Sequence, residues 1–536
     1  MTYATPSIGL ARPVPSGEAE IIPQAFAASS LGVLLVAAAR RHPARPALVV
    51  DNDAISYAEF LGRAAAIAGA LRGARHAAVL AGRGLVAYTA IAGAALAGAA
   101  YVPLNPHHPR ERLRFMLDAS EAEAIVLDRA GLDVARALLE AAEQPLHVLL
   151  PEATTVPDWA TTLPRHRFLV RTDLEAERHL PVPPEDSGRG AYLLFTSGST
   201  GVPKGVRIIQ SNVLAYLRHV AARYRPQAED RFTQLFDLTF DLSVHDMFLC
   251  WGAGAALHAP PDSARINPRD FVRRHEPTFW FSVPSVAAFM ARLHALRPGD
   301  FPSLRWALFC GEALPTRLAL AFAEAAPNAI VENLYGPTEA TIAITAFRLP
   351  VDPAERARLP AIVPIGTSFP GQSTRIVDGE LCLHGSQVAE GYWRLPVLTT
   401  ERFAPLPDRP AAERWYRTGD RASMTPDGLV LHGRLDRQIK LSGHRIELQD
   451  VEVALRRAAG SDSAAAIAWP IGADGLVHGL VGFVPDSAAP NETVLAACRA
   501  LLPPYMRPAQ IRRLAVWPVN ANGKTDYAHL AHLMES

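Results

Sequence analysis

The sequence predicts an α/β protein: a large N-terminal domain of parallel-rich αβ layers with a small antiparallel barrel-like part, then a small mobile α+β domain. Its 536 residues exceed one ordinary domain of ~100–200 residues. Up to about residue 360, short apolar strands alternate with helical patterns, as in a parallel sheet covered on both faces. Shorter apolar runs among Pro and Gly follow, which favours antiparallel sheet, and a compact tail begins near residue 437.

The first part of the chain alternates helical spacing with strand runs. Residues 31–43 and 56–72 have the helical pattern, and Ser56 is an N-cap candidate for the second helix. Apolar strands are predicted at 46–50, 77–81, 123–127, 191–195, 278–284, 306–310 and 329–334. Residues 84–102 carry no charge, and their length alone nominates a membrane helix. Because they are mostly Ala and Gly, which contribute little transfer energy, we expect a close-packed helix in a protein core and no membrane span.

The last part of the chain has the texture of a separate small domain. Strands at 379–385 and 428–433 are predicted in the antiparallel part before it, and strands at 475–485 and 509–518 within it. Helices are predicted at 445–460, ending at Gly460, and at 491–502, capped by Asn491. We therefore expect a disordered tail at 1–28, a large core at 29–433, a polar hinge at 434–437 and a small C-terminal domain at 438–536.

Composition excludes several classes of protein. Hydrophobic residues make up 49% and charged residues 20%, so wholesale disorder is excluded. Lys plus Arg (53) equals Asp plus Glu (53), which argues against nucleic-acid binding by bulk charge. The four cysteines are scattered without a CxxC pair, so neither a disulfide framework nor a cysteine zinc site is expected. With no secretory signal at the N-terminus, a reducing, cytoplasmic location is expected.

The densest chemical signal is the segment FTSGSTGVPKG at 195–205. It offers hydroxyls, glycines that let backbone N–H groups approach an anion, and one cation: Thr196, Ser197, Gly198, Ser199, Thr200, Gly201, Lys204 and Gly205. It is not the GxxxxGK[ST] loop, because Pro203 stands in place of the second glycine and a strand-like run follows. The alternative is a flexible surface loop, which this density of hydroxyls and glycines disfavours.

Eight motifs in a fixed order resemble the adenylate-forming superfamily, which includes acyl-CoA synthetases, luciferases and the adenylation domains of nonribosomal peptide synthetases. In chain order they are LAGAAYVPLNP, YLLFTSGSTGVPKGV, FDLSVHDMF, NLYGPTEATIAIT, GELCLHG, YRTGD, GRLDRQIKLSGHRIELQDVE and NGKTD. The resemblance covers about residues 30 to 530. FDLSVHD, LFCGEALP and LDRQIKLSGHRIEL look most similar to D-alanine:carrier-protein ligases and related free-standing amino-acid adenylation enzymes.

The resemblance implies a reaction in two halves. A carboxylate first attacks the α-phosphorus of ATP and gives an acyl-adenylate and pyrophosphate, and a thiol, usually of phosphopantetheine, then attacks that anhydride. The protein mainly positions the reactants and neutralises charge.

By motif match, the resemblance also assigns roles to single residues. The loop from Thr196 to Lys204 would hold the β- and γ-phosphates, and Glu339 would ligate Mg²⁺. The rest of the nucleotide set is Tyr335 near the adenine, Thr338 at the α-phosphate, Asp420 and Arg434 at the ribose, Lys524 at the substrate carboxylate and the phosphate, and also Asn333 and Gly336. Asp436 would be the hinge of the small domain, which carries Lys524 away after the first half. Gly443 would leave room for a pantetheine tunnel.

The resemblance places an acid in the substrate pocket. Asp241 would pair with the α-ammonium of an amino acid; the alternative is that Asp241 caps the helix that follows. The other matching positions are Leu242, His245, Ser282, Leu308, Cys310, Leu334, Ile342 and Ala343. This set is small and mainly apolar, so charged substrate side chains are disfavoured. Alanine is the first candidate, followed by glycine, serine and cysteine, and His245 raises serine somewhat.

The acceptor is expected to be a separate carrier protein, because the chain ends soon after Tyr527 and leaves no room for a fused carrier domain. One alternative is an acyl-CoA ligase that uses coenzyme A. Another is a non-catalytic adenylate-binding regulator, which the presence of Glu339, Asp420 and Lys524 disfavours.

Overall fold

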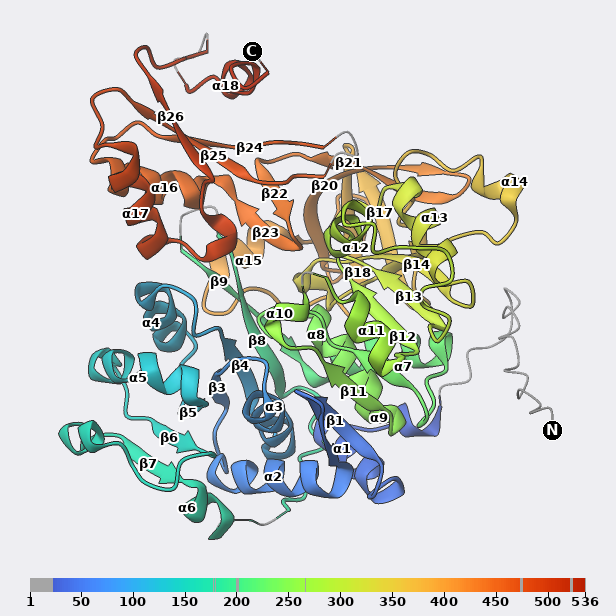
Figure 1. Cartoon of the computed structure of the whole chain (residues 1–536), viewed down its shortest axis with the longest axis vertical. Helices are drawn as coiled ribbons and strands as arrows, with labels where there is room; N and C mark the ends of the chain where they lie inside the picture. The colour runs from blue at the N-terminus through green and yellow to red at the C-terminus, as the bar shows by residue number, and fades with distance from the viewer. Residues whose placement is uncertain are drawn as a thin grey trace.

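The computed structural model confirms a mixed α/β fold with parallel-rich layers, an antiparallel sheet and a small α+β part (Figure 1). It describes residues 23–176, 178, 180–198, 202–265, 267–472, 476–520 and 524–535. Most of the tail predicted at 1–28 lies outside the described residues, whereas η1 (Gln24–Phe26) already belongs to the fold, with Phe26 buried. The expected domain boundaries stay predictions.

A seven-stranded sheet forms the first layer, in the order β7-β6-β5-β3-β4-β8-β9. All neighbouring strands are parallel except the last pair, in which β9 runs antiparallel to β8. The strands are β3 (His76–Leu80), β4 (Ala100–Leu104), β5 (Ala124–Leu127), β6 (His147–Leu150), β7 (Arg167–Val170), β8 (Gly190–Thr196) and β9 (Lys204–Ile209). The helices of this layer are α2 (Tyr57–Ala70), α3 (Leu85–Ala97), α4 (Arg110–Ala119), α5 (Arg129–Ala141), η2 (Asp158–Thr162) and α6 (Arg171–Ala176).

A nine-stranded sheet forms the second layer, in the order β16-β15-β14-β13-β12-β10-β11-β1-β2, parallel from β14 to β1. Its strands are β1 (Pro46–Val50), β2 (Asp53–Ser56), β10 (Arg231–Thr233), β11 (Ala256–Ala259), β12 (Phe279–Ser282), β13 (Trp306–Phe309), β14 (Ile330–Tyr335), β15 (Thr345–Arg348) and β16 (Thr367–Ser368). Its helical segments are α1 (Leu31–Arg41), α7 (Gln210–Tyr224), α8 (Leu242–Val244), the π-helical η3 (His245–Leu249), α9 (Cys250–Ala253), α10 (Asp262–Arg265), α11 (Arg269–His275), α12 (Pro284–Arg292), α13 (Thr316–Ala325), η4 (Thr338–Ala340) and α14 (Pro353–Arg356).

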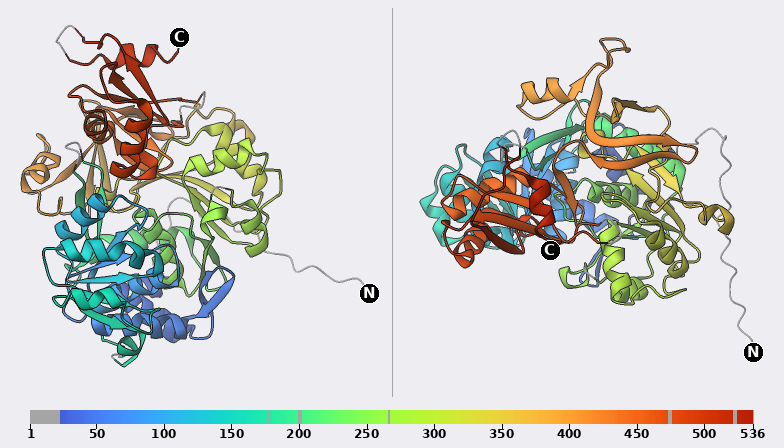
Figure 2. Two further views of the ribbon diagram at one scale, coloured as in Figure 1. Left: turned by 60° about the vertical axis from the view of Figure 1, so that its left-hand side comes forward. Right: turned by 90° about the horizontal axis from the view of Figure 1, so that it is seen from above.

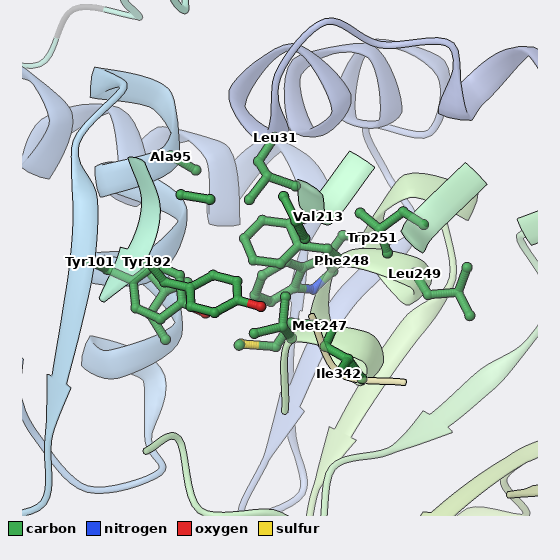
Figure 3. Packing of buried hydrophobic residues seen from close by; sticks show 14 of the residues in the cluster. Leu31, Ala95, Tyr101, Tyr192, Val213, Met247, Phe248, Leu249, Trp251 and Ile342 are labelled. Carbon is green, nitrogen blue, oxygen red and sulfur yellow. The ribbon is translucent and has the colours of Figure 1, made fainter. Parts of the chain in front are cut away.

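The two layers share one apolar core. In Figure 3, Tyr101 and Tyr192 lie side by side, and their ring centroids are 5.7 Å apart. The uncharged segment 84–102 divides into buried α3 and the start of β4, which explains its lack of charge without a membrane. Among the described residues, no helix is both long and apolar enough to cross a bilayer. All four cysteines are described, and each is a buried thiol.

A smaller antiparallel sheet follows, in which the long β20 pairs with β18, β19 and β21. Its elements are β17 (Gln372–Val377), β18 (Glu380–Gly385), α15 (Pro396–Arg402), β19 (Phe403–Ala404), β20 (Trp415–Thr425) and β21 (Gly428–Arg434). The predicted hinge at 434–437 lies where β21 ends and the C-terminal part begins.

The C-terminal part, which is the described portion of residues 438–535, has its own α+β core. Its elements are β22 (Gln438–Leu441), β23 (His444–Glu447), α16 (Leu448–Ala459), β24 (Ala465–Ala468), β25 (Leu480–Pro485), α17 (Asn491–Leu501), η5 (Pro504–Met506), β26 (Gln510–Leu514) and α18 (Tyr527–His532). Figure 2 shows from two directions that this part sits over the seven-stranded layer.

Two details of the predicted tail are wrong. The helix predicted from 445 begins at Leu448, because His444–Glu447 pairs with Gln438–Leu441 as a short antiparallel ribbon. The predicted cap Asn491 is instead the first residue of α17, and Pro490 is the N-cap. The side-chain amide of Asn491 donates to the carbonyl of Ile511. Two other ends are confirmed: Ser56 caps α2, and Gly460 ends α16 in a left-handed conformation.

Candidate active site

A cleft lies where the two layers, the antiparallel sheet and the C-terminal part meet. The predicted residues that line it are Thr196, Ser197, Asp241, Leu242, Cys310, Tyr335, Gly336, Thr338, Asp420, Arg434 and Gly443. Most of them stand at or just beyond the carboxyl ends of strands, where ligands bind in open α/β sheets.

The loop between β8 and β9 is built as the sequence predicts, strand to strand, with Thr196 paired to Lys204 in register. The buried hydroxyl of Thr196 has no hydrogen-bond partner among the described residues, so it is available to a phosphate oxygen. The Ser197 hydroxyl donates to the carbonyl of Arg445, 2.6 Å away. Gly198 and Lys204 face a second cavity behind the loop. The predicted positions Ser199, Thr200 and Gly201 lie outside the described residues.

Lys204 is buried beside one acid and one phenol. Its Nζ lies 3.6 Å from Oε1 of Glu339 and 3.3 Å from the hydroxyl of Tyr392. Burial and the neighbouring Arg445 lower the pKa of Lys204 to about 8 in spite of Glu339. The amine therefore still carries its charge at neutral pH, as a phosphate ligand should.

Glu339 lies in η4 and is fully buried, but it is already paired. The Nη1 of Arg445 donates to both of its oxygens, at 3.1 and 2.9 Å, and the Tyr392 hydroxyl donates at 2.8 Å. Burial opposes ionisation, but Arg445 and Lys204 outweigh it and lower the pKa of Glu339 to about 2. A lone ionised carboxylate fits Mg²⁺, which takes one or two carboxylates together with phosphate and water oxygens. It fits only when Arg445 has moved away.

One hydrogen-bonded network joins the predicted ribose acid to the predicted hinge. Asp420 accepts from the Tyr335 hydroxyl at 2.6 Å and from Nη1 of Arg434 at 2.6 Å. The same guanidinium donates to both oxygens of Asp436, at 2.6 and 2.8 Å. Each carboxylate oxygen of Asp420 has a second lone pair that a ribose hydroxyl can use.

The remaining nucleotide residues support the cleft in different ways. Asn333 does not line it; its side-chain amide donates to the carbonyls of Val363 and Pro364 behind the strand. At Gly336, a Cβ atom would lie 2.5 Å from Cα of Ala343, so only glycine allows these two segments to approach so closely.

Asp241 is not a helix cap. Its side chain makes no capping hydrogen bond, and its Oδ2 accepts from the backbone N–H of Ile342 at 3.2 Å. Thr341 and Ile342 both have left-handed backbones, with φ of 57° and 74°. β-Branched residues rarely adopt this conformation, and such strain is typical of functional sites. Burial, opposed by this hydrogen bond, raises the pKa of Asp241 to about 6.

The other predicted substrate residues divide into three groups. Leu242 and Cys310 line the cleft beside Asp241, and burial raises the pKa of the Cys310 thiol to about 12. Ser282 lines the adjoining cavity. The fully or almost fully buried members that line neither cavity are His245, Leu308, Leu334, Ile342 and Ala343.

His245 is a neutral part of the wall. Its Nδ1 lies 2.7 Å from the Tyr216 hydroxyl, and its Nε2 has no partner among the described residues. Burial lowers the pKa of His245 to about 3. The residue stands in the π-helical turn η3, next to Asp241 and α8, and π-helical turns are frequent at functional sites.

The adjoining cavity has a volume of about 520 Å³ and shares Phe240, Gly443 and His444 with the cleft. Gly443 has φ of 79°, and its N–H donates to Glu312 at 2.8 Å. A Cβ atom at Gly443 would lie 2.5 Å from Cγ1 of Val283, so a side chain would narrow the cavity. The pantetheine tunnel that the sequence resemblance predicts beside Gly443 would run through this cavity to the cleft.

Of the predicted catalytic residues, Thr196 lines the cleft, Lys204 and Glu339 are buried as a pair that does not line it, and Lys524 does not reach it. It is exposed on the C-terminal part and does not line the cleft. Its neighbours Asn522 and Gly523 lie outside the described residues.

Sequence reasoning missed two cations of the C-terminal part, Lys440 and Arg445, which line the cleft. The Nζ of Lys440 lies 5.6 Å from the ring centroid of Tyr335. Lys440 could have been noticed because lysine is rare in this chain: Lys204, Lys440 and Lys524 are the only lysines among the 53 basic residues. No comparable signal marked Arg445, because arginine is abundant throughout the chain.

Comparison with known proteins gives one family. Residues 35–393 match the model of the AMP-binding enzyme family. The chain is 34% identical over 518 residues to an L-proline–[L-prolyl-carrier protein] ligase of Streptomyces coelicolor, which covers 91% of this chain and 94% of that protein. It is 33% identical over 490 residues to a hybrid PKS-NRPS synthetase of Aspergillus violaceofuscus, of which it spans 12%.

Among solved structures, the Vibrio cholerae adenylation domain AlmE, in complex with glycyl-adenosine-5′-phosphate, superposes with a TM-score of 0.85 at 31% identity. The superposition covers 97% of this chain and 100% of that one.

Proposed function

The chain belongs to the AMP-binding enzyme family, and on this premise we propose that it activates a small amino acid with ATP and passes it to the phosphopantetheine thiol of a separate carrier protein. The observation that carries the proposal is Asp241, a buried carboxylate at the wall of the cleft whose role is not to cap a helix. A buried carboxylate is costly unless a cation meets it, and the α-ammonium of an amino acid is such a cation.

In the first half-reaction, a carboxylate oxygen of the amino acid attacks the α-phosphorus of ATP, and the bond to the β-phosphate oxygen breaks. The hydroxyl of Thr196 and the amine of Lys204 hold the departing phosphates, and Thr338 faces the α-phosphate. Asp420 and Arg434 fix the ribose. Mg²⁺ at Glu339 would neutralise charge on the phosphates.

Lys524 completes the first half-reaction only if the C-terminal part rotates. Its single charge would bridge the substrate carboxylate and the α-phosphate while negative charge shifts between them. We propose that the hinge at Asp436 allows this rotation, and that the arrangement seen here serves the second half.

In the second half-reaction, the carrier thiol attacks the acyl carbon, loses its proton, and AMP leaves. The cavity beside Gly443 supplies a path for the pantetheine arm toward the carbonyl of the adenylate. With Lys524 away, the path is open at the cleft.

The substrate is a small, uncharged amino acid, with alanine as the first candidate and glycine, serine and cysteine next. Besides Asp241, the predicted pocket residues are neutral, and burial keeps His245 neutral as well. Two relatives point to the same size class, one named for L-proline and one bound to a glycyl adenylate. Proline is a candidate that the pocket residues alone did not suggest.

Pyrophosphate exchange tests the proposal. Purified protein is assayed with ATP, labelled pyrophosphate and each of the twenty amino acids, and the small ones, alanine included, are expected to support exchange. Holo-carrier protein or coenzyme A is then added, and the thioester is detected by mass. Exchange with none of the amino acids would refute the proposal, and a coenzyme A thioester without carrier loading would make the chain an acyl-CoA ligase.

A further inference from the structure

The loop that carries Lys524 joins β26 to α18 and is closed by hydrogen bonds among its described residues. The backbone N–H of Asn520 donates to the carbonyl of Lys524 at 2.7 Å, and the Lys524 N–H donates to the side-chain oxygen of Asn520 at 3.1 Å. Beside this pair, Val519 and Thr525 form an isolated β-bridge. The backbone of Lys524 is therefore fixed within its loop, and the place of the lysine depends on how the loop itself is held.

The loop is attached to the rest of the C-terminal part through α18, which follows it directly. This helix has six residues, fewer than the ~12–15 that an isolated helix needs to be stable in water. Leu530 is its one buried residue, and it packs against strands β24 and β25. The first residue of the helix, Tyr527, makes a second contact with the body of the C-terminal part, three residues after Lys524.

That second contact is a guanidinium over an aromatic ring. The Cζ of Arg437 lies 3.3 Å from the centroid of the Tyr527 ring, well within the range in which a cation and a ring attract each other. The same guanidinium lies 2.9 Å from Oε1 of Glu452 and donates to the carbonyl of Ala466 at 2.7 Å. The Glu452 side chain is 5% exposed, and the Tyr527 hydroxyl is hydrogen-bonded to it as well. Arg437 thereby ties the start of α18 to α16 and β24.

Arg437 is also the first residue beyond the proposed hinge. Asp436 accepts from Arg434 at the end of β21, on the core side. The contacts of Arg437 with Tyr527, Glu452 and Ala466 all lie within the C-terminal part. Two consecutive residues are thus anchored on opposite sides of the hinge, and a rotation there leaves the stack of Arg437 on Tyr527 intact.

We propose that Arg437, through its stack on Tyr527, is a positioning residue for Lys524: it fixes the lysine loop to the body of the C-terminal part, so that rotation brings the lysine to the cleft as part of one rigid unit. This inference rests on the proposed function. Without the stack, the loop keeps Leu530 as its buried anchor, and the amine is spread over several positions. Adenylation needs the amine at one place, between the carboxylate and the α-phosphate, whereas transfer to the thiol does not use it.

Tyr527→Ala and Arg437→Ala test the proposal through the two half-reactions. The kcat of pyrophosphate exchange is expected to fall by about tenfold or more, because a displacement of about 1 Å can cost about a hundredfold. The KM values for ATP and the amino acid are expected to stay as in wild type, since neither residue lines the cleft. Transfer from a chemically prepared adenylate is expected to stay as well, which also shows that the variants are folded.

Two further variants separate a positioning role from a general structural one. Tyr527→Phe keeps the ring under the guanidinium and is expected to lose much less exchange activity than Tyr527→Ala. In a Lys524→Ala background, Arg437→Ala is expected to lower pyrophosphate exchange no further, because a residue that acts only through Lys524 has nothing left to position.

Deuterium uptake followed by mass spectrometry gives a readout that does not depend on activity. Backbone amides in 524–532 are expected to take up deuterium several-fold faster in Arg437→Ala and Tyr527→Ala, while those of α17 are unchanged. The matched control is Arg513→Ala, which removes another arginine of the same part that donates to the carbonyls of Ala488 and Ala489 at 2.8 and 3.0 Å. It is expected to leave both the uptake at 524–532 and the pyrophosphate exchange as in wild type.

Unchanged deuterium uptake at 524–532 in both alanine variants would overturn the inference. An equal loss of adenylation and transfer, or a further loss in the Lys524→Ala background, would overturn it too. Failure of the proposed function looks different: the wild-type protein then exchanges pyrophosphate with none of the amino acids. In that case the deuterium uptake alone decides whether Arg437 holds the lysine loop.

Discussion

At the scale of single residues, the proposed recognition of an amino acid depends most on the cost of burying Asp241. Asp241 is 6% exposed, and its carboxylate accepts hydrogen bonds from the backbone N–H of Ile342 and from the side chain of Thr338. Burial raises the pKa of Asp241 to about 6, so without a substrate the ionised carboxylate is destabilised by desolvation at neutral pH. In the proposed function, an amino acid offsets this cost by supplying an ammonium, whereas a simple carboxylic acid does not.

Asp241→Asn is therefore expected to stabilise the substrate-free protein. In the folded state Asp241 holds its proton up to about pH 6, above the usual value of 3.8, so stability falls as pH rises from about 4 to 6 and the penalty is complete above that. A shift of this size corresponds to about 3 kcal/mol. Urea unfolding is expected to show the variant more stable than wild type at pH 8, with a difference that shrinks toward pH 4. Equal stability of the two proteins at pH 8 would mean that burying the ionised Asp241 carboxylate does not destabilise the fold.

Sequence could pair Asp241 with a function only through its motif. An Asp before a helix is equally compatible with capping, and the choice depends on where the side chain points. That direction is set by Ile342, about a hundred residues away in the sequence, whose left-handed backbone aims its N–H at the acid. No local pattern encodes such a contact.

At the scale of elements, the β22–β23 ribbon contributes residues to the cleft, whereas the sequence predicted a helix from residue 445. The ribbon brings Gly443 and Arg445 to the cleft, and the sequence predicted only the position of Gly443 there. The long strands and helices of the core were predictable because their apolar runs are continuous. The ribbon was not, because it is short, half-polar and stabilised by docking against the core.

Gly443→Val is expected to block transfer to the thiol while sparing adenylation. A Cβ atom there would lie 2.5 Å from Val283, and the longer side chain would enter the proposed tunnel. Pyrophosphate exchange should stay within a few-fold of wild type, and thioester formation should fall by roughly a hundredfold, since a misplaced acceptor loses its orientation.

The matched control for Gly443 is Gly460→Val. Gly460 also has a positive φ, 64°, but a Cβ atom there would meet nothing within 4 Å. It therefore carries the same backbone strain without a tunnel to block. If both variants lose transfer to the same extent, strain alone explains the loss and the tunnel assignment fails.

At the scale of the whole molecule, the structure presents one of the two arrangements that the proposed reaction needs. Arg445 and Lys440 face the cleft, whereas Lys524 is exposed outside it. The sequence indicated a hinge near Asp436 and a catalytic lysine beyond it. It could not indicate which arrangement is the resting one, because that depends on buried contacts such as Arg445 with Glu339.

The rotation is testable because the chain has only three lysines. Acetylation followed by mass spectrometry reads each of them separately. Lys524 is expected to react fast in the free protein and several-fold more slowly with Mg²⁺·α,β-methylene-ATP and the amino acid, while buried Lys204 stays slow throughout. An unchanged rate at Lys524 would contradict the rotation.

Lys524→Ala gives the matching activity result. Because the proposed mechanism uses the charge of Lys524 only in the first half-reaction, exchange is expected to fall by about a hundredfold or more. Transfer from a chemically prepared adenylate should remain. Near-normal exchange in this variant would remove Lys524 from the mechanism.

The most direct measurement compares an amino acid with the same acid lacking its amino group. Pyrophosphate exchange is measured with the best amino acid of the panel and its desamino analogue, for example alanine and propionate, in wild type and in Asp241→Asn. The account predicts that wild type prefers the amino acid by about a hundredfold or more in kcat/KM, as expected for a buried charge pair, and that the variant loses most of this preference. Equal exchange with alanine and propionate in the wild-type protein would contradict it.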